Sequence, residues 1–131
     1  MSIKAHYSQL VMPHQINNVG TLFGGQLVSW MDMAAAKVAY RFLKGTQAWG
    51  AVTRVIEEVE FRHPIYAGEW VTFAGHVVAA GKSSITIHID AYAESRDESQ
   101  HLACTARIVM VAVHKNIDGN FTKFIHGKHV E

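Results

Sequence analysis

The segment 17–44 constrains the fold more than any other part of the chain, because it joins a glycine-bearing loop to a long, mostly apolar helix. Ala, Leu and Met are good helix formers, and no proline interrupts this run. Gly24 and Gly25 mark the beginning of the predicted helix, and Gly45 and Thr46 follow its end. The segment therefore predicts one long helix that most of the remaining chain has to cover.

One carboxylate, Asp32, interrupts the apolar run of this helix. On a helical wheel at ~100° per residue, the polar residues Gln26, Lys37, Arg41 and Lys44 fall on one narrow stripe. Asp32 lies roughly 140° from the centre of that stripe, so we expect it to point where the apolar residues point. An ionised carboxylate in apolar surroundings is costly unless a polar group meets it. The position indicates either a structural bond to a backbone amide or a lysine, or a functional carboxylate.

Size, charge and cysteine content narrow the class of protein. The 131 residues, 49% of them hydrophobic, suffice for one domain with one core. A net charge of +1, without a basic stripe or polybasic segment, gives no reason to expect a nucleic-acid or membrane partner. Cys104 is the only cysteine, so no intramolecular disulfide forms, and a reducing, cytoplasmic setting fits. Residues 1–10 lack the apolar core of a signal peptide, and the charges in the long helix argue against a membrane span.

Beyond the helix the hydrophobic pattern changes to the period of a strand. From residue 51, alternate positions up to Phe61 are expected to share one face, Thr53, Val55 and Glu57 among them. The other expected elements are a short strand at 2–12, a loop at 13–23, strands at 70–80, 84–94 and 101–114, turns at 67–69, 81–83 and 116–120, and a loop at 95–100. Strands that follow a helix without helices between them predict an antiparallel sheet, hence an α+β fold.

The domain is expected to span 1–120, and the polar tail at 121–131 is expected to be loose. A helix that is apolar on most sides needs covering on most sides. A strongly curved sheet wrapped around it would do this, and so would a second copy of the chain. Trp30 falls near the polar stripe, which adds to the case for a contact between copies.

Several short motifs follow one another in a fixed order along the chain. They are Met12–Pro13, Asn17-x-x-Gly20-x-Leu22-Phe23-Gly24-Gly25, Asp32 within the helix, Phe61-x-His63-Pro64, Gly68–Glu69 and Gly81-Lys82-Ser83-Ser84. In this order and spacing they resemble the hotdog-fold acyl-CoA thioesterases, in the acyl-CoA hydrolase branch that includes small bacterial enzymes. The resemblance covers most of the chain, from about Met12 to about His114.

The resemblance implies one central helix wrapped by a curved antiparallel sheet, and hydrolysis of acyl-CoA to a fatty acid and coenzyme A. It also implies a homodimer whose subunits pair through their sheets, with active sites at the interface, and a tetramer or hexamer as larger alternatives. The family's catalytic asparagine maps onto Asn17 and its catalytic acid onto Asp32, contributed by opposite subunits. The glycine amide at the helix start maps onto Gly24 or Gly25.

These residue types suit thioester hydrolysis. Negative charge develops on the carbonyl oxygen, and backbone N–H groups at a helix N-terminus stabilise such charge. A glycine there lets the substrate approach the backbone closely. A carboxylate in a largely apolar site can act as a general base on water or attack the carbon directly, and the residues leave both routes open. Asn17 would position the water or the carbonyl, and the Gly25 N–H would contact the oxyanion.

Two further sets of residues are candidates for binding coenzyme A. Lys82, Ser83 and Ser84 match the family's turn that meets the pantetheine or nucleotide, although an ordinary hairpin turn explains them equally well. Arg62 and His63 could meet phosphates. The family often has a basic residue directly before the proline, whereas here His63 holds that place and Arg62 precedes it, and neighbouring strand residues face opposite ways.

Other functions fit the sequence less well. His126 and His129 have ligand-like spacing but no acidic partner nearby, so neither a metal nor a separate cofactor is expected. Cys104 alternates with apolar residues as a small core residue would. A non-catalytic acyl-CoA-binding regulator would not need Asp32. A hotdog hydratase or dehydratase generally pairs its acid with a histidine in the motif region, and His14 precedes that region.

Overall fold

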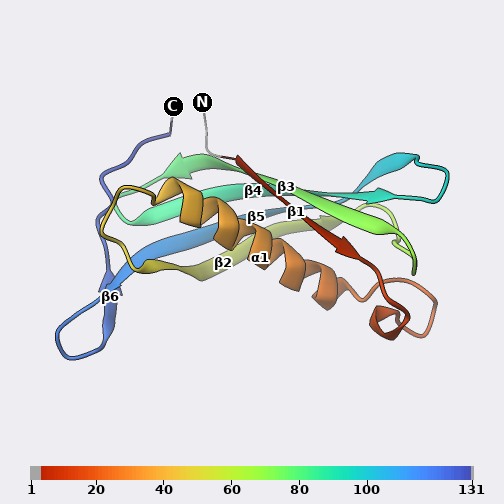
Figure 1. The fold of residues 1–131 in the computed structure, drawn as a ribbon, viewed down its shortest axis with the longest axis horizontal. Helices are drawn as coiled ribbons and strands as arrows, with labels where there is room; N and C mark the ends of the chain where they lie inside the picture. The colour runs from red at the N-terminus through yellow and green to blue at the C-terminus, as the bar shows by residue number, and fades with distance from the viewer. Residues whose placement is uncertain (1–3, 131) are drawn as a thin grey trace.

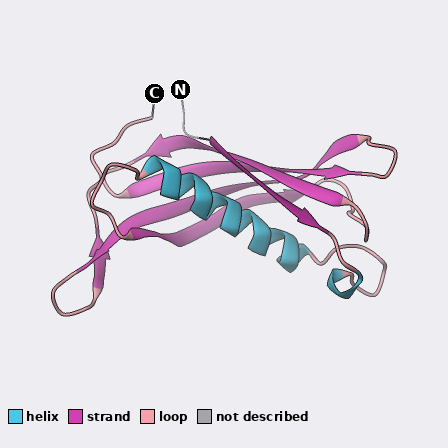
Figure 2. Cartoon of the chain, in the orientation of Figure 1, coloured by secondary structure: helices cyan, strands magenta, loops and turns pink. Residues whose placement is uncertain are grey.

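The computed structural model describes residues 4–130, which form one long α-helix and a six-stranded antiparallel sheet (Figures 1 and 2). This is the α+β arrangement that the sequence predicts. The elements in chain order are β1 (Lys4–Leu10), the 3-10 helix η1 (Pro13–Gln15), α1 (Gly24–Phe42), β2 (Gly50–Phe61), β3 (Trp70–Ala80), β4 (Ser84–Glu94), β5 (Gln100–Lys115) and β6 (Phe121–Lys123). Ser2 and Ile3 of the expected first strand lie outside the described residues.

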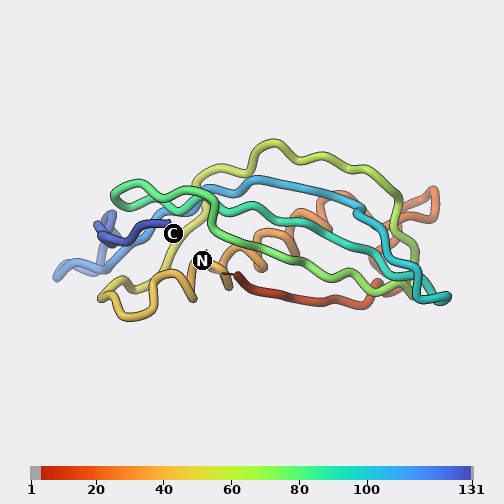
Figure 3. Tube along the Cα trace, turned by 90° about the horizontal axis from the view of Figure 1, so that it is seen from above, coloured from red at the N-terminus to blue at the C-terminus, as the bar shows by residue number. Residues whose placement is uncertain are grey.

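The sheet places β1 and β2 at its two edges. The order of the long strands is β1-β3-β4-β5-β2, and the short β6 pairs with β5 (Figure 3). The helix lies across one face of this sheet and contacts all five long strands. Its N-terminal end is close to the end of β2, and its C-terminal end is close to the turn between β3 and β4 (Figure 1).

The core lies between α1 and the inner face of the sheet. The buried residues of the helix recur at the spacing of one helical face. They are Leu27, Trp30, Met31, Ala34, Ala35, Val38, Ala39 and Phe42. Gly75 on β3 lets the helix approach the sheet closely, because a Cβ there would lie 2.6 Å from Ile89 Cδ1 and 2.9 Å from Val38 Cγ2.

Trp30 is buried inside the chain, which makes its interpretation as a contact between copies wrong. Only 3% of its surface is exposed, and its ring meets the ring of Phe73 edge-on at 6.2 Å. Strand β1 covers this flank of the helix, which a helical wheel cannot reveal. Lys37 and Arg41 on the same flank donate hydrogen bonds from their side chains to β1 carbonyl oxygens, at 2.6 and 2.9 Å.

Strand β2 does not keep the regular alternation that the sequence predicts. Its register against β5 shifts between Thr53 and Val55, and again between Glu57 and Glu60. Each shift leaves one or more residues of β2 without a paired residue on β5. Such bulges change which side chains face inward. Thr53 therefore faces the helix, opposite the buried Met110, whereas Val55 is opposite Val109 on the other face.

The segment after residue 120, which the sequence predicts to be a loose tail, is mostly exposed but is attached to the rest of the chain at several points. Strand β6 pairs with β5, and the backbone N–H of His126 donates to the Lys82 carbonyl at 3.1 Å. The His126 side chain is buried, and its Nε2 donates to the Ser84 carbonyl at 3.0 Å. The tail is thereby fixed to the turn between β3 and β4. The placement of the domain boundary at residue 120 stays a prediction.

We expect Gly75→Ala to destabilise the fold by about 1–3 kcal/mol, because the added methyl group overpacks the contact with Val38 and Ile89. Urea unfolding measures the effect as a lower transition midpoint. Gly50→Ala is the matched control, since a Cβ at Gly50 would meet no atom within 4 Å. Equal midpoints for the two variants would contradict this account of the core.

Candidate active site

Asp32 lies on the flank of α1 that is next to the edge strand β2. It is half-buried, between the fully buried Met31 and the exposed Met33. The Thr53 hydroxyl of β2 donates a hydrogen bond to its Oδ1 at 2.6 Å. The carboxylate therefore lies at the boundary of the apolar face rather than within it, and its polar partner is a side chain of another element. Among residues 4–130 no second group bonds this carboxylate, so Oδ2 is open to water or substrate.

Thr53 is a site residue that sequence reasoning missed. Its hydroxyl fixes the orientation of Asp32, and a hydrogen bond to a charged group is stronger than one between neutral groups. The alternation of β2 gave only a weak signal, because it placed Thr53 on one face together with Val55. The bulge at Arg54 and the packing of β2 beside α1 decide the contact, and neither follows from the sequence.

Asn17 organises the loop before the helix. Its Oδ1 accepts hydrogen bonds from the backbone N–H groups of Val19 at 3.1 Å and Thr21 at 3.0 Å. Its Nδ2 donates to the Thr21 hydroxyl at 2.9 Å. Gly20 in this loop has φ +90°, a left-handed conformation that favours glycine. An amide nitrogen carries two N–H groups, so one of them is left for a ligand after Thr21 takes the other.

The helix begins with backbone N–H groups that no side chain caps. Phe23 is the N-cap residue and makes no side-chain capping bond. The N–H groups of the first helical turn have no partner within a helix, and the helix dipole makes this end attractive to negative charge. A Cβ at Gly24 would lie 3.2 Å from Phe61 Cζ, so glycine at this position lets the Phe61 ring pack closely against the helix start. Gly25 is exposed, and a Cβ there would meet nothing within 4 Å, so its backbone is accessible.

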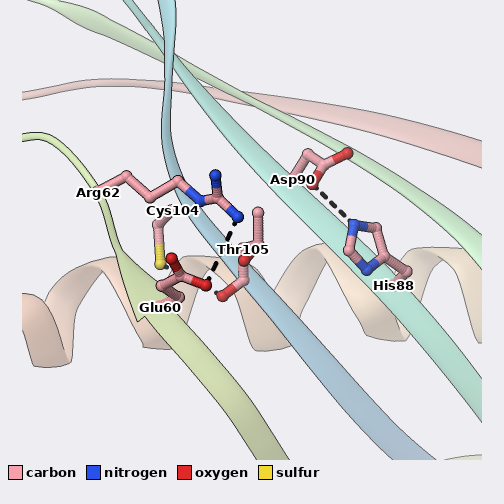
Figure 4. Close-up of polar contacts among 6 residues, drawn as sticks. All are labelled: Glu60, Arg62, His88, Asp90, Cys104 and Thr105. Carbon is pink, nitrogen blue, oxygen red and sulfur yellow. Dashed lines mark hydrogen bonds and ion pairs between the residues drawn. The ribbon is translucent and has the colours of Figure 1, made fainter.

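A cleft of about 350 Å³ opens beside this end of the helix. We call it the helix-start cleft. It brings Gly24 together with Arg62 and His63, which follow directly after β2. The Arg62 guanidinium points toward Glu60, whose carboxylate lies 3.5 Å away (Figure 4), and the His63 ring meets the ring of His101 at 5.1 Å. Two candidate groups, the helix start and the basic residues, therefore share one cleft.

One copy of the chain does not bring all the candidate residues together. Asp32 follows Gly24 by eight residues, which corresponds to about 12 Å along the helix. The Asn17 loop precedes the helix start and lies beyond it (Figure 1). Within the described part of the chain, Asn17 bonds only its own loop and Asp32 bonds only Thr53. The Asp32 carboxylate therefore forms one half of the candidate site, and the Asn17 loop with the helix start forms the other half.

Lys82, Ser83 and Ser84 lie at the other end of the molecule. The Gly81 N–H donates to the Ser84 hydroxyl at 3.0 Å and to its carbonyl at 3.1 Å, so Ser84 builds the turn. The tail that bonds this turn also packs on the last residue of α1, where the ring of His126 meets that of Phe42 at 5.3 Å. These three residues are therefore remote from Arg62 and His63 in the same copy.

The outer face of the sheet carries other polar side chains. His88 and Asp90 on β4 are joined at 2.7 Å, in front of the sheet in a view where the helix lies behind it (Figure 4). Across residues 4–130, no group of three or more His, Cys, Asp or Glu side chains is placed to hold a metal ion. No helix in the same range is both long and apolar enough to cross a membrane.

Cys104 is a core residue, as its alternation with apolar neighbours predicts. It is fully buried on β5, and this burial raises the pKa of its thiol to about 11. Only the thiolate is a good nucleophile, so the structure gives Cys104 no role in acyl transfer. Asp32, in contrast, is a reactive group that is only half-buried.

The family model of the thioesterase superfamily matches residues 19–100, which include α1 and the strands β2, β3 and β4. The chain belongs to the thioesterase superfamily. The matched region contains Asp32, Thr53 and both glycines of the helix start, but not Asn17.

The relatives of this chain include several bacterial proteins that are described as acyl-CoA thioester hydrolases. An uncharacterized acyl-CoA thioester hydrolase of Haemophilus influenzae is 35% identical over 83 residues, 63% of this chain and 51% of the relative. Another, from Buchnera aphidicola strain APS, is 30% identical over 110 residues, 81% of this chain and 78% of the relative. The chain thus spans about half the length of the first relative and most of the second.

Two solved structures of the superfamily confirm the hotdog fold. The acyl-CoA hydrolase of Staphylococcus aureus, in complex with butyryl coenzyme A, is 25% identical with a TM-score of 0.76, over 92% of this chain and 70% of that chain. The hexameric thioesterase of Yersinia pestis is 26% identical with a TM-score of 0.76, over 95% of this chain and 94% of that chain.

The folded protein should not react with Ellman's reagent at pH 8, because the pKa of Cys104, about 11, keeps its buried thiol protonated. Denaturation in urea exposes the thiol and restores an ordinary pKa, so one equivalent should then react within minutes. Absorbance at the usual thiol-detection wavelength measures the reaction of the folded protein and that of the denatured protein. Rapid reaction of the folded chain at pH 8 would show that Cys104 is accessible.

Proposed function

We propose that this chain is an acyl-CoA thioester hydrolase, which cleaves the thioester bond to a carboxylic acid and coenzyme A. The observation that carries the proposal is the half-buried Asp32 carboxylate, held at 2.6 Å by the Thr53 hydroxyl. The superfamily and the described activities of its relatives support the same reaction. A ligand-binding module would gain nothing from an ionised carboxylate beside an apolar acyl group.

Asp32 supplies the reactive group in this proposal. The Thr53 bond occupies Oδ1 and fixes the side chain, so Oδ2 is directed at water or at the thioester carbon. As a general base, Asp32 takes a proton from the attacking water; as a nucleophile, it forms an anhydride that water then hydrolyses. Both routes need the ionised form. In the general-base route the coenzyme A thiolate leaves when the tetrahedral intermediate from water collapses, and in the nucleophilic route it leaves when the anhydride forms; in each case a proton then neutralises the thiolate.

The loop of a second copy would complete the site. The oxyanion of the tetrahedral intermediate needs donors about 3 Å from its oxygen, and the accessible Gly25 N–H at a helix start is such a donor. The free N–H of the Asn17 amide would hold the water or the carbonyl. These groups belong to one half of the site and Asp32 to the other, so we assign the two halves to opposite subunits of a homodimer.

The edge strand β2 is the natural contact between such subunits. It carries Thr53, it ends beside the helix-start cleft, and its apolar residues Val52 and Ile56, which lie on opposite faces of the strand, are 51% and 38% exposed. Antiparallel pairing of two β2 edges about a two-fold axis would bring the beginning of one strand next to the end of the other. A helix start would then lie near the partner's Asp32. The Yersinia relative is a hexamer, and a hexamer built from three such dimers is compatible with this pairing.

Coenzyme A would bind across the same interface. Arg62 and His63 lie in the cleft that contains Gly24, and we assign them to coenzyme A as the cationic side chains beside the helix start. Lys82, Ser83 and Ser84 lie at the opposite end of their own copy. They contact the same coenzyme A only if another copy contributes them, and Lys82 is the exposed charge among them.

Asp32→Asn should lower the rate of coenzyme A release from acyl-CoA by at least a hundredfold, because the amide can neither accept the proton nor attack. Release of free thiol from acetyl-CoA and octanoyl-CoA measures it, and the midpoint of urea unfolding should stay that of the parent. Full activity of the variant would overturn the assignment of Asp32. Tight binding without release by the parent would instead indicate a regulator, and addition or loss of water would indicate a hydratase.

Thr53→Val should lower kcat by about 10- to 100-fold, the effect of losing a hydrogen bond of 1.5–3 kcal/mol to a charged group. Thr53→Ser keeps the hydroxyl and should retain most of the activity. The two variants differ little in volume, so their unfolding midpoints serve as the control for folding. Equal turnover by the Val and Ser variants would show that the hydroxyl does not hold Asp32 for the reaction.

A further inference from the structure

The hairpin formed by β5 and β6 carries a fully exposed aliphatic side chain at its tip. Ile117 lies in the turn between the two strands, and 101% of its surface is exposed. The hairpin projects from the end of the molecule at which α1 ends (Figure 1). Among residues 4–130 no other residue covers Ile117, so its side chain contributes nothing to the core. None of the residues in this hairpin was a site candidate in the sequence.

Hydrogen bonds hold the turn that presents Ile117. The Asn116 Oδ1 accepts the backbone N–H groups of Asp118 and Asn120, each at 3.0 Å. The Gly119 N–H donates to the Asn116 carbonyl at 3.0 Å, and Gly119 has φ +85°, a left-handed conformation that favours glycine. The turn therefore places Ile117 at a defined position ahead of the two strands.

Aromatic and cationic side chains lie at the base of this turn. Lys115 and Phe121 are paired across the hairpin, and Lys123 follows Phe121 by two residues, so the three side chains share one face. The Lys115 Nζ lies 5.4 Å from the centre of the Trp49 ring and 5.9 Å from that of Phe121. The two rings are 66% and 59% exposed. We call Trp49, Lys115, Ile117, Phe121 and Lys123 the β5–β6 patch. Exposed apolar side chains with a polar rim mark a contact with a protein or a membrane.

The surroundings of the β5–β6 patch are cationic. Asp118 is the only acidic residue in 101–130. Lys44, just beyond the end of α1, lines a cleft together with Trp49, and the Lys128 Nζ donates to the Lys44 carbonyl at 3.2 Å. These lysines come from separate segments of the chain, which is why the sequence shows no polybasic segment and gives no reason to expect a membrane partner. The fold gathers them at one end of the molecule.

The hairpin lies away from the edge of β2 that we assign to the homodimer. Val113 of β5 pairs with Gly50 of β2 on one side and with Lys123 of β6 on the other. A two-fold contact between two β5–β6 patches would join like surface to like surface and bring lysines together. Like charges repel, so a second copy of the same patch is a poor occupant. The patch therefore suits a partner that is negatively charged and has an apolar interior.

We propose that the β5–β6 patch docks on the surface of an anionic phospholipid bilayer. Ile117 and Phe121 enter the boundary between headgroups and acyl chains, where amphipathic segments place their apolar side. Trp49 lies at the level of the headgroups, the place that Trp and Tyr prefer at membranes. Lys115 and Lys123 meet the lipid phosphates, because an anionic surface attracts nearby cations. A nucleic acid would match the lysines and the rings but would leave Ile117 in water.

Co-sedimentation with lipid vesicles tests the proposal. At low salt the parent should bind vesicles of phosphatidylcholine with about 40% phosphatidylglycerol but not vesicles of phosphatidylcholine alone, and added salt should release it. Lys115→Gln/Lys123→Gln should lower the partition coefficient about 20-fold, because each lysine near an anionic surface contributes about fivefold. Ile117→Ser should lower it about tenfold, because the tip then has no aliphatic group to bury in the lipid.

Two variants outside the patch are the matched controls. Arg96→Gln/Arg107→Gln removes the same number of exposed positive charges, and Val19→Ser removes an apolar side chain that is 75% exposed in another loop. Both should bind the anionic vesicles within about twofold of the parent. All the substituted side chains are exposed, so the midpoints of urea unfolding should stay close to the parent's and exclude a loss of folding as the cause of weaker binding.

The proposal is overturned if the parent binds neutral and anionic vesicles alike, if it binds neither, or if the patch variants bind as well as the controls. It is also overturned if the lysine variant loses binding while Ile117→Ser keeps it, since the protein would then adsorb by charge alone.

Two other occupants of the patch give different results. A smaller mass of Ile117→Ser in light scattering, without vesicle binding by the parent, would show a contact between copies and overturn the proposal. Binding of a fluorescent single-stranded oligonucleotide that Lys115→Gln/Lys123→Gln abolishes, again without vesicle binding, would show a nucleic-acid surface and overturn it as well. None of these measurements requires turnover, so their outcome is independent of the proposed function.

Discussion

The candidate active site depends on one hydrogen bond between the helix and an edge strand, from the Thr53 hydroxyl to the Asp32 carboxylate at 2.6 Å. This bond keeps a charged group at the margin of an apolar helix, where an unpartnered carboxylate would be costly. It also fixes one oxygen of the carboxylate and leaves the other open. The bulge in β2 at Arg54 is part of the same arrangement, because it lets Thr53 face the helix while the rest of the strand keeps its pairing with β5.

The fold separates the carboxylate from the helix start by about 12 Å along α1, and this separation explains several features together. The Asn17 loop and Gly25 are exposed at one end of the helix, and Asp32 is half-buried in its middle. The edge of β2 is available to a second copy. A homodimer that pairs these edges would unite the two halves twice, once at each end of the two-fold contact. The superfamily's larger assemblies, such as the Yersinia hexamer, are consistent with this unit.

The sequence predicts the elements better than their contacts. The helix and the four long strands after it follow from local patterns, since helical and strand periods and turn residues are properties of neighbouring positions. Trp30 was misassigned because a helical wheel does not show that β1 crosses its flank. Thr53 was missed because its register depends on a bulge, and the tail around His126 was expected to be loose because its few apolar residues find partners only in the folded molecule.

Mixed oligomers test the shared site most directly. Asn17→Asp keeps the Oδ1 bonds that build its loop but removes the amide N–H, and Asp32→Asn removes the carboxylate. Each variant alone should be inactive in thiol release. Co-expressed with different tags, they should recover about a quarter of the parent's specific activity, since half of the dimers are mixed and one of the two sites in each is intact. No recovery in mixed dimers whose presence both tags verify would contradict a site assembled from two copies.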